Sequence, residues 1–421
     1  MTINVLRQQP HRTRKTARFQ IDYWLLLILI CLVGFGLLMV YSATFDLGIR
    51  ARGDAVYYFK RQLVAAGIGL LGILIIMQFD YMLFTKFSIL LMLFTIGILI
   101  ALPFIGQELG GATRGFSQGS YSPSELAKLT LILYIAHWLS SKGDRIKDMT
   151  YGLFPFAFIT GGVCAMVVSQ PDLSTAILIA LTAFTIFFIA GADLRQFIIA
   201  AVLGGAVFSA FILTFPHSRA RVNAYLGSVQ DPTQAHDQVQ QGIIALANGN
   251  IFGIGIGQGV QKFDNLPAAH TDGMFAIIGE EVGLIGTVGV MLIFALLIWR
   301  GIVIASKAKT EYGTLLALGI TCWFAYQALI HMAVVTAVIP VTGMPLPFMS
   351  YGGTSMTVSM FGAGFLLNIS RDTAMNRPLR QQERSRSARS ASESRRSGRQ
   401  RDRSGEQERS SRRRSAITNK K

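Results

Sequence analysis

The chain has 421 residues, of which 51% are hydrophobic and only 15% are charged, and its formal net charge is +16. Soluble globular proteins usually carry about 25% charged residues, so this composition excludes an ordinary soluble enzyme and indicates several membrane spans. The excess charge lies at the two ends: residues 1–20 are basic without any acid, and residues 371–421 hold 17 Lys and Arg against six Asp and Glu. Basic ends beside a neutral hydrophobic body indicate contact with anionic lipid and argue against nucleic-acid binding.

Ten segments of the body, residues 21–370, have about the length and apolarity of a membrane-spanning helix. They lie near residues 22–43, 61–80, 84–105, 125–141, 151–169, 173–191, 196–215, 274–301, 314–338 and 351–369. An even number of spans places both termini on one side, and the basic tails place that side in the cytoplasm. We therefore predict an all-α polytopic membrane protein with about ten transmembrane helices, and a break in the eighth helix between Gly283 and Gly286.

The outer face then receives four longer connections, at residues 44–60, 106–124, 216–273 and 339–350. Arg50, Arg52 and Lys60 lie in the first of them, against the usual inward bias of basic residues. The large extracytoplasmic loop 216–273, between spans seven and eight, is long enough to suggest a function, and its apolar segment 251–257 is expected to fold back into the protein. The Ser/Arg-rich residues 371–421 lack aliphatic side chains, which predicts a disordered cytoplasmic tail.

The fourth span opens with the sequence SYSPSELAK, residues 120–128. Ser122, Pro123 and Glu125 have the spacing of a helix-capping box. Lys128 follows Glu125 by three residues on the same helical face, where an unpaired lysine costs on the order of 3 kcal/mol at mid-span. Lys128 is therefore either an ion-pair partner of Glu125 or, with Arg114 from the preceding glycine-rich loop, part of a cationic site for a diphosphate. Arg114 alone would be a solvated loop charge.

Two further segments carry short loops with proline. SQPDLSTA, residues 169–176, separates the fifth and sixth spans, and Asp172 is expected to cap the sixth. VTGMPLPFMSYGGTS, residues 341–355, separates the last two spans and cannot form a plain helix. Irregular backbone at this depth has to be buried in protein or to line a cavity.

The large loop concentrates ionisable residues at its two ends. Arg219 and Arg221 lie near its start and are candidates for binding an anion; Lys262, Asp264, His270 and Asp272 lie near its end. His270 and Asp272 have no third ligand at a recognisable spacing, so no protein-only metal site is predicted. Asp272 either caps the eighth span or takes part in chemistry. Glu280 and Glu281, two turns into that span, require partners or a polar cleft.

These segments together resemble the SEDS family of cell-wall proteins, the group of FtsW, RodA and SpoVE. The resemblance rests on PSELAK at 123–128, QPDLSTA at 170–176, LPAAHTD at 266–272, IIGEEVG at 277–283 and PVTGMPLPFMSYGGTS at 340–355. It implies a peptidoglycan glycosyltransferase that polymerises lipid II outside the bacterial cytoplasmic membrane, with a class B penicillin-binding protein transpeptidase as partner. It also implies that Asp272 is catalytic and that Arg114 and Lys128 matter for activity. The chain departs from the family pattern at Gly115 and at Gly273–Met274.

Residues 261–283 resemble the division-type FtsW more than RodA, which implies work at the division septum with other division or elongation proteins. In this hypothesis Asp272 accepts a proton from an acceptor sugar hydroxyl, and nearby cations offset the charge of the leaving diphosphate. A divalent cation, Mg²⁺ or Mn²⁺, could share that role through the substrate. The candidate substrate-binding residues are Arg114, Glu125, Lys128, Arg219, Arg221, Lys262 and His270.

Two alternatives remain at this stage. A lipid II flippase or transporter would place its indispensable charges inside the membrane, at Glu280, Glu281 or His331. A non-catalytic membrane scaffold of the division machinery would use the basic tail for docking, but it gives no reason for the buried charges.

Overall fold

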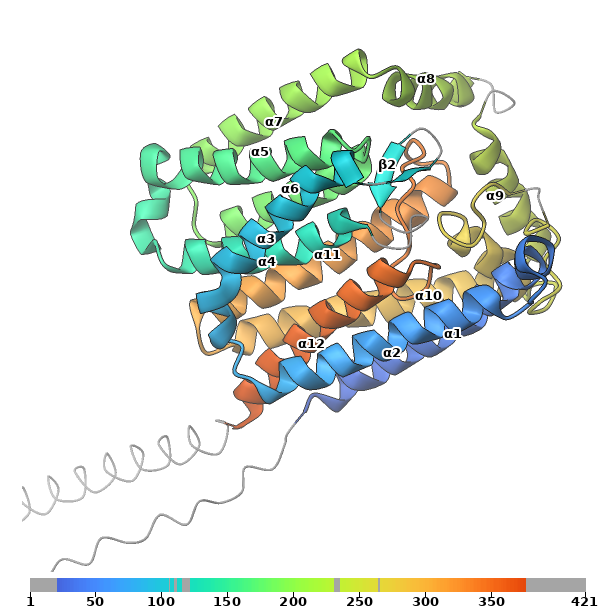
Figure 1. The fold of residues 1–421 in the computed structure, drawn as a ribbon, viewed down its shortest axis with the longest axis horizontal. Coiled ribbons are helices and arrows are strands. Elements are labelled where there is room, and N and C mark those ends of the chain that lie inside the picture. The colour runs from blue at the N-terminus through green and yellow to red at the C-terminus, as the bar shows by residue number, and fades with distance from the viewer. Residues whose placement is uncertain are drawn as a thin grey trace, which may run out of the picture. The chain divides into compact units, whose positions relative to one another are not determined.

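The computed structural model describes residues 21–105, 107–109, 112–115, 122–230, 235–263 and 266–375. Residues Ile21–Arg371 form one compact helical unit (Figure 1). Ten helices overlap the predicted spans within this described part: α1 (Tyr23–Arg52), α2 (Tyr57–Gln78), α3 (Leu83–Ile105), α4 (Pro123–Ser140), α5 (Phe154–Val168), α6 (Leu173–Ile189), α7 (Leu194–Thr214), α10 (Met274–Lys307), α11 (Glu311–Val335) and α12 (Gly353–Met375). The other elements are β1 (Gln107–Leu109), β2 (Ala112–Gly115), the 3₁₀ turn η1 (Gly143–Lys147), the π turn η2 (Met149–Leu153), α8 (Pro216–Gln230) and α9 (Asp237–Gly249).

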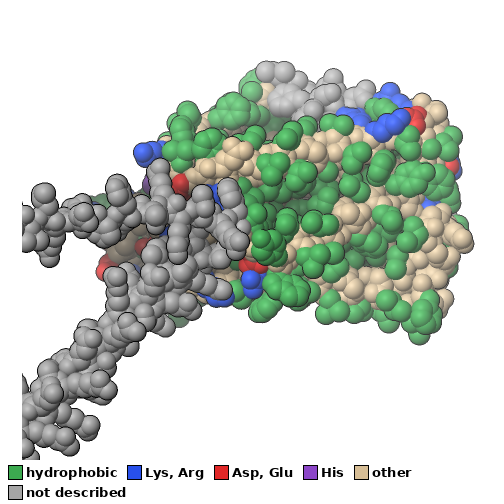
Figure 2. Space-filling model, turned by 90° about the horizontal axis from the view of Figure 1, so that it is seen from below, with side chains coloured by type: hydrophobic (Ala, Val, Ile, Leu, Met, Phe, Trp, Pro, Cys, Tyr) green, Lys and Arg blue, Asp and Glu red, His purple; other side chains and the backbone are tan. Residues whose placement is uncertain are grey.

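The all-α membrane class is confirmed, with one antiparallel hairpin, β1–β2, in the described part of the chain. Among the described residues, seven segments are long and apolar enough to cross a membrane by length and composition: α1, α2, Leu83–Leu102, Met149–Val168, α7, α10 and α11. Hydrophobic side chains cover much of the face in Figure 2, and charged side chains gather toward its ends. The full count of ten spans stays a prediction.

Helix ends follow from local sequence. Asp22, Asp172 and Asp193 each precede an apolar run, and each side chain accepts a hydrogen bond from an amide in the first turn of α1, α6 or α7. The predicted Asp172 cap is thereby confirmed. Helix α1 continues to Arg52 and ends at Gly53, whose φ of 69° lies in the left-handed region. The first outer connection, predicted at residues 44–60, thus begins as a continuation of helix α1.

Helices α4 and α11 lie at the centre of the unit. Helix α4 packs against α3, α6 and α11, and α11 packs against α10. A helix that is apolar on all sides is stable when it is surrounded by other helices, and α4 is buried along most of its length. Helix α7, by contrast, buries only Gln196 and Ala200. Side chains near the N-terminus of α4 and the C-terminus of α11 are therefore fixed by the packing of this core.

The predicted break in the eighth span is present at Gly283, whose φ of 75° interrupts α10. An unbroken helix would donate the amides of Leu284 and Ile285 to the carbonyls four residues earlier. These amides donate instead to Asn250 O and Ile251 O, at 2.9 and 3.2 Å. The two freed carbonyls accept from the amides of residues 254 and 255, each at 3.0 Å. A Cβ at position 283 would meet the Gly253 amide and the Ile251 carbonyl, so glycine is required for this approach.

The large outer loop is more structured than a plain connection. It contains α8 and α9, and the segment after α9 folds back onto the α10 break, as predicted for residues 251–257. Helix α9 forms because Val239, Gly242, Ala245 and Gly249 recur every three or four residues and are buried on one face. Sequence reasoning missed this helix because it considered only spans long enough to cross a membrane.

Candidate active site

A cleft of about 840 Å³ opens among the ends of α1, α2, α4 and α6 and the segments that precede α10 and α12. Three of the predicted site residues line it: Glu125, His270 and Asp272. Its other polar lining includes Arg52, Lys60, Arg61, Asp172 and Thr342. The lining also includes apolar side chains, among them Val64, Ile68 and Val358. A single cleft therefore joins carboxylates, cations and an apolar surface.

A tight turn before α10 presents Asp272. The amides of Thr271, Asp272 and Gly273 all donate to the carbonyl of Ala268, at 3.0, 3.0 and 3.2 Å. The N-cap of α10 is Gly273, so Asp272 lies one residue before the cap. Its carboxylate faces Gly343, because a Cβ built on Gly343 would lie 3.4 Å from Asp272 Oδ2.

The irregular segment before α12 holds this turn in place. The Ser350 hydroxyl donates to Thr271 O at 2.6 Å, and the Tyr351 amide donates to His270 O at 2.9 Å. Gln62 of α2, which is fully buried, bonds this segment at both ends of its side-chain amide: Nε2 donates to Ser350 O and Oε1 accepts from the Gly352 amide. The prediction that this segment is buried or lines a cavity is confirmed. Its role is to fix the backbone that carries Asp272.

Glu125 and Lys128 form a buried ion pair with 2.7 Å between Oε2 and Nζ. Lys128 also donates to Gln327 Oε1 at 3.0 Å and lies 5.3 Å from the centre of the Trp323 ring. Glu125 lines the cleft, whereas Lys128 is 3% exposed and lies outside the cleft lining. Of the two predicted roles of Lys128, the structure therefore shows the ion pair with Glu125. The ammonium group of Lys128 balances the charge of the Glu125 carboxylate from the protein interior.

The predicted capping box at the start of α4 is wrong in one respect. Ser122 is the N-cap and Pro123 follows it, but the Ser122 side chain makes no capping bond. Its hydroxyl lies 2.9 Å from Ser124 Oγ, which donates to Asp172 Oδ2 at 3.0 Å. Glu125 pairs with Lys128 at 2.7 Å, and the N-cap amide of Ser122 donates to Thr354 Oγ1 at 3.2 Å instead of to Glu125. Asp172 thus caps α6 and also joins α6 to α4.

The predicted basic residues of the large loop lie apart from the cleft lining. Arg219 is exposed on α8, and Arg221 on the same helix donates to Thr342 O at 3.5 Å, next to the cleft. Lys262 is buried against Glu281, with 2.7 Å between Nζ and Oε1, so direct contact with a substrate is not what the structure shows. The backbone of Arg114 lies in β2, and its side chain falls outside the described part of the structure. Asp264 falls outside the described residues.

Three cations of the cleft were missed as site residues. Arg52 ends α1, and Lys60 and Arg61 lie near the start of α2. The Arg52 and Arg61 guanidinium carbons lie 5.3 and 5.8 Å from the centre of the Tyr57 ring. One sequence feature could have pointed to Arg52 and Lys60: both lie in a connection predicted to be outside, whereas basic residues usually lie on the cytoplasmic side.

His270 packs among aromatic rings, with centroids 6.2 Å from Tyr58 and 5.6 Å from Tyr351. Burial lowers the pKa of His270 below its usual range. The imidazole is therefore neutral at pH 7, and it offers a hydrogen-bonding group next to Asp272 without adding positive charge. Within the described residues, no group of three or more His, Cys, Asp or Glu side chains is placed to hold a metal ion.

Comparison with known proteins identifies the architecture. The sequence model of the cell cycle protein family FtsW/RodA/SpoVE matches residues 23–375. The chain belongs to this family. It is 38% identical over 363 residues to the stage V sporulation protein E of Bacillus subtilis, covering 85% of this chain and 98% of that protein. It is 37% identical to a probable peptidoglycan glycosyltransferase FtsW of Trichlorobacter lovleyi, covering 83% and 93%.

Solved structures of the FtsW/RodA/SpoVE family share this fold. One chain of a structure that describes how a peptidoglycan synthase complex coordinates polymerization and crosslinking superposes with a TM-score of 0.69 and 26% identity, over 84% of this chain and 98% of that one. The rod shape determining protein RodA of Thermus thermophilus superposes with a TM-score of 0.63 at 24% identity, over 84% and 98%. The arrangement of long helices described above is therefore that of the family.

In this family member, replacing Gly343 with alanine should lower the enzymatic activity by more than the accompanying loss of stability explains. Gly343 has a φ of 77°, so alanine adds backbone strain of about 1 to 2 kcal/mol. The new methyl group would also lie in van der Waals contact with the Asp272 carboxylate, 3.4 Å from Oδ2, and would occupy space beside the proposed base. Gly53→Ala is the matched control, because Gly53 has a φ of 69° with open space around its Cβ position. Thermal unfolding should show a similar loss of stability for the two variants. Activity should fall only for Gly343→Ala. Equal activity in both would contradict the placement of Asp272.

Proposed function

We propose that this chain is a peptidoglycan glycosyltransferase that polymerises lipid II at the outer face of the bacterial cytoplasmic membrane. The observation that carries the proposal is the placement of Asp272 in a cleft that is also lined by Arg52, Arg61 and apolar side chains. Lipid II is an amphiphile with a sugar, a diphosphate and a long hydrocarbon, so it needs all three kinds of surface in one site. The relatives named as peptidoglycan glycosyltransferases support the same activity.

The reaction joins an acceptor sugar hydroxyl to the anomeric carbon of the donor. Asp272 accepts the hydroxyl proton as the new C–O bond forms, and the bond from the anomeric carbon to the diphosphate breaks. General-base assistance of this kind contributes about 10² to 10⁴-fold. The electron pair leaves with the diphosphate, whose negative charge is offset by Arg52, Lys60 and Arg61. Arg114 remains a proposed contributor to this cationic site.

A divalent cation, Mg²⁺ or Mn²⁺, fits this chemistry as a companion of the diphosphate. Glu125 and Asp272 supply carboxylate oxygens to the cleft, which are the ligands such ions prefer. The Glu125 charge is already balanced by Lys128, and Asp272 is needed as the base, so the ion would be held mainly by the diphosphate of the substrate. The ion would add positive charge near the leaving group when it is bound.

The proposed setting follows from the charges and the relatives. Both basic tails, residues 1–20 and 371–421, lie in the cytoplasm, where they contact anionic lipid. The proposed partner is a class B penicillin-binding protein transpeptidase, which cross-links the new strands, and other division or elongation proteins complete the assembly. The likeness to a chain from a peptidoglycan synthase complex supports this partnership. The likeness to sequences named FtsW supports the proposal that the chain works at the division septum.

Reconstitution of the purified chain in vesicles with lipid II tests the proposal. Glycan strands should form without any other polymerase, and gel electrophoresis of labelled product should resolve them as a ladder. The flippase alternative predicts movement of labelled lipid II across the bilayer without a ladder. The contacts of Glu280 and Glu281 favour the polymerase, because both carboxylates bond to the protein itself instead of facing the cleft. Transport without polymer would overturn the assignment.

A further inference from the structure

The segment Asn250–Lys262, here called the glycine loop, combines a polar inner side with an apolar outer side. Its outward side chains are large and hydrophobic: Ile251 is 56% exposed, Phe252 79%, Ile254 37%, Ile256 54% and Val260 55%. A connection that stands in water normally presents polar side chains to it. The composition of the outer side indicates a non-aqueous neighbour.

Most backbone amides of the glycine loop have hydrogen-bond partners within the protein. Besides the four bonds to the α10 break, three amides donate to carboxylates at 3.0 to 3.3 Å: Gly257 to Glu281, and Val260 and Gln261 to Glu280. Gly253 donates to Gly249 O at 2.7 Å and Gln258 to Gly255 O at 3.1 Å. Irregular backbone can lie in the hydrocarbon region only when its amides find such internal partners. Eight amides of the loop, those of residues 250, 253–255, 257, 258, 260 and 261, meet this condition.

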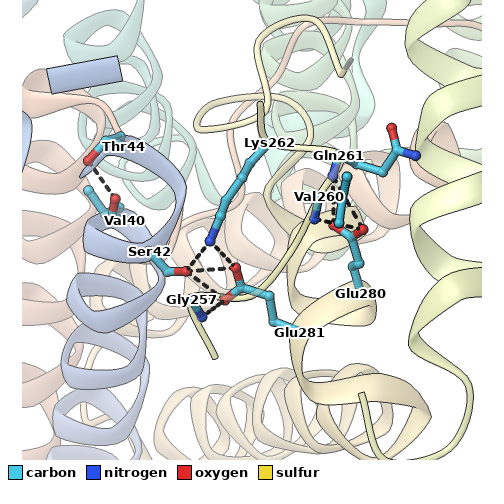
Figure 3. Close-up of polar contacts among 9 residues, drawn as sticks. All are labelled: Val40, Ser42, Thr44, Gly257, Val260, Gln261, Lys262, Glu280 and Glu281. Atoms are coloured by element: carbon cyan, nitrogen blue, oxygen red, sulfur yellow. Dashed lines mark hydrogen bonds and ion pairs between the residues drawn. The ribbon is translucent and has the colours of Figure 1, made fainter. Parts of the chain in front are cut away.

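The inner side is closed by a buried charged network, which Figure 3 shows. Lys262 Nζ lies 2.7 Å from Glu281 Oε1 and 3.1 Å from Ser42 Oγ. The Ser42 hydroxyl, from α1, donates to the same carboxylate. Glu280 and Glu281 are 0% and 1% exposed. The glycine loop covers these carboxylates, so its apolar outer side separates them from whatever lies beyond.

The outer side of the loop continues a lipid-facing stripe of α10. Leu284, Val288, Leu292 and Trp299 are spaced by four or seven residues and are 57%, 43%, 59% and 57% exposed. Helix α10 has the length and hydropathy of a membrane span. The amide of Ile285, itself 56% exposed, donates to Ile251 O, which places the start of the loop beside the start of this stripe. The apolar surface is thus continuous from the helix to the loop.

We propose that the glycine loop is inserted in the outer leaflet of the membrane, with Phe252 and Ile256 in contact with lipid acyl chains. Glu280 and Glu281 serve this insertion by accepting backbone amides that lipid cannot satisfy. The loop anchors the outer segment that leads from Lys262 to Asp272 at a fixed depth. The proposal concerns a lipid contact and does not depend on the reaction in the cleft.

Spin labels at single cysteines test it in the full-length chain, in vesicles of phosphatidylethanolamine and phosphatidylglycerol. The three native cysteines, Cys31, Cys164 and Cys322, are free and are first replaced by serine. A nitroxide on Phe252→Cys is compared with one on Leu292→Cys, a lipid-facing position of α10, and one on Asp144→Cys, an exposed position in η1. Collisions with oxygen, which partitions into the bilayer, and with a water-soluble nickel complex are measured.

The label at residue 252 should match the label at 292, with strong oxygen contact and a loss of nickel contact relative to 144. A label that instead matches 144 overturns the proposal, and so does a label shielded from both reagents in the purified chain. Nickel contact that disappears only after a transpeptidase is added would assign this surface to a protein partner and also overturn it. Ile256→Cys provides a second position, should the first variant fail to fold.

Discussion

Replacing Asp272 with asparagine is expected to lower the rate of lipid II polymerisation by about 10² to 10⁴-fold, the usual contribution of a general base. Asparagine keeps the size of the side chain beside Gly343 but cannot accept the proton of the acceptor hydroxyl. The Ser350 and Tyr351 bonds that hold the turn involve only the backbone of residues 270 and 271, so they persist in the variant. The rate of glycan formation by the purified chain gives the answer.

Asp237→Asn is the matched control for this experiment. Asp237 lies in the first turn of α9, in the same outer region, and its side chain is exposed. The control should polymerise at the parent rate, and thermal unfolding should be the same for both variants and the parent. Polymer formation by Asp272→Asn at the rate of the control would remove Asp272 from the mechanism and leave the cleft without its proposed base.

Replacing Lys262 with methionine is expected to destabilise the fold by about 3 to 5 kcal/mol, the cost of removing one partner of a buried ion pair. The Lys262 and Glu281 side chains are 1% and 0% exposed, so water cannot solvate the remaining carboxylate. The double variant Lys262→Met with Glu281→Gln should recover much of the loss, because it leaves no buried charge unpaired at this point. Unfolding of the purified chain by a denaturing detergent measures the free energies.

Lys60→Met serves as the control for the same substitution at an exposed pair. The Lys60 and Asp54 side chains are 65% and 40% exposed and lie 3.0 Å apart, and pairs of this kind contribute about 0 to 1 kcal/mol. A loss for Lys262→Met no larger than that of Lys60→Met would show that the pair at Glu281 is solvated. The glycine loop would then not cover the carboxylates as described.

The sequence by itself determined the helical membrane class, because a run of about 20 apolar residues has few other stable structures. It also pointed to a break near Gly283 to Gly286, and it indicated that Glu280 and Glu281 need partners, since a buried carboxylate without partners is too costly to keep. The Asp172 cap followed from its position before an apolar run. Each of these features depends on residues close together in the chain or on the cost of burial.

Only the tertiary structure decided which groups meet. Ser42 reaches Glu281 across 239 residues, and Gln62 reaches Ser350 across 288. Lys262 belonged by sequence to the cluster around Asp272 but is buried beside Glu281, while Arg52 and Arg61 were assigned no role yet line the cleft. Hydrophobic periodicity reports which side of a helix is buried but carries no information on which distant segment covers it. Helix packing supplies that information, so the membership of the cleft could be read only from the fold.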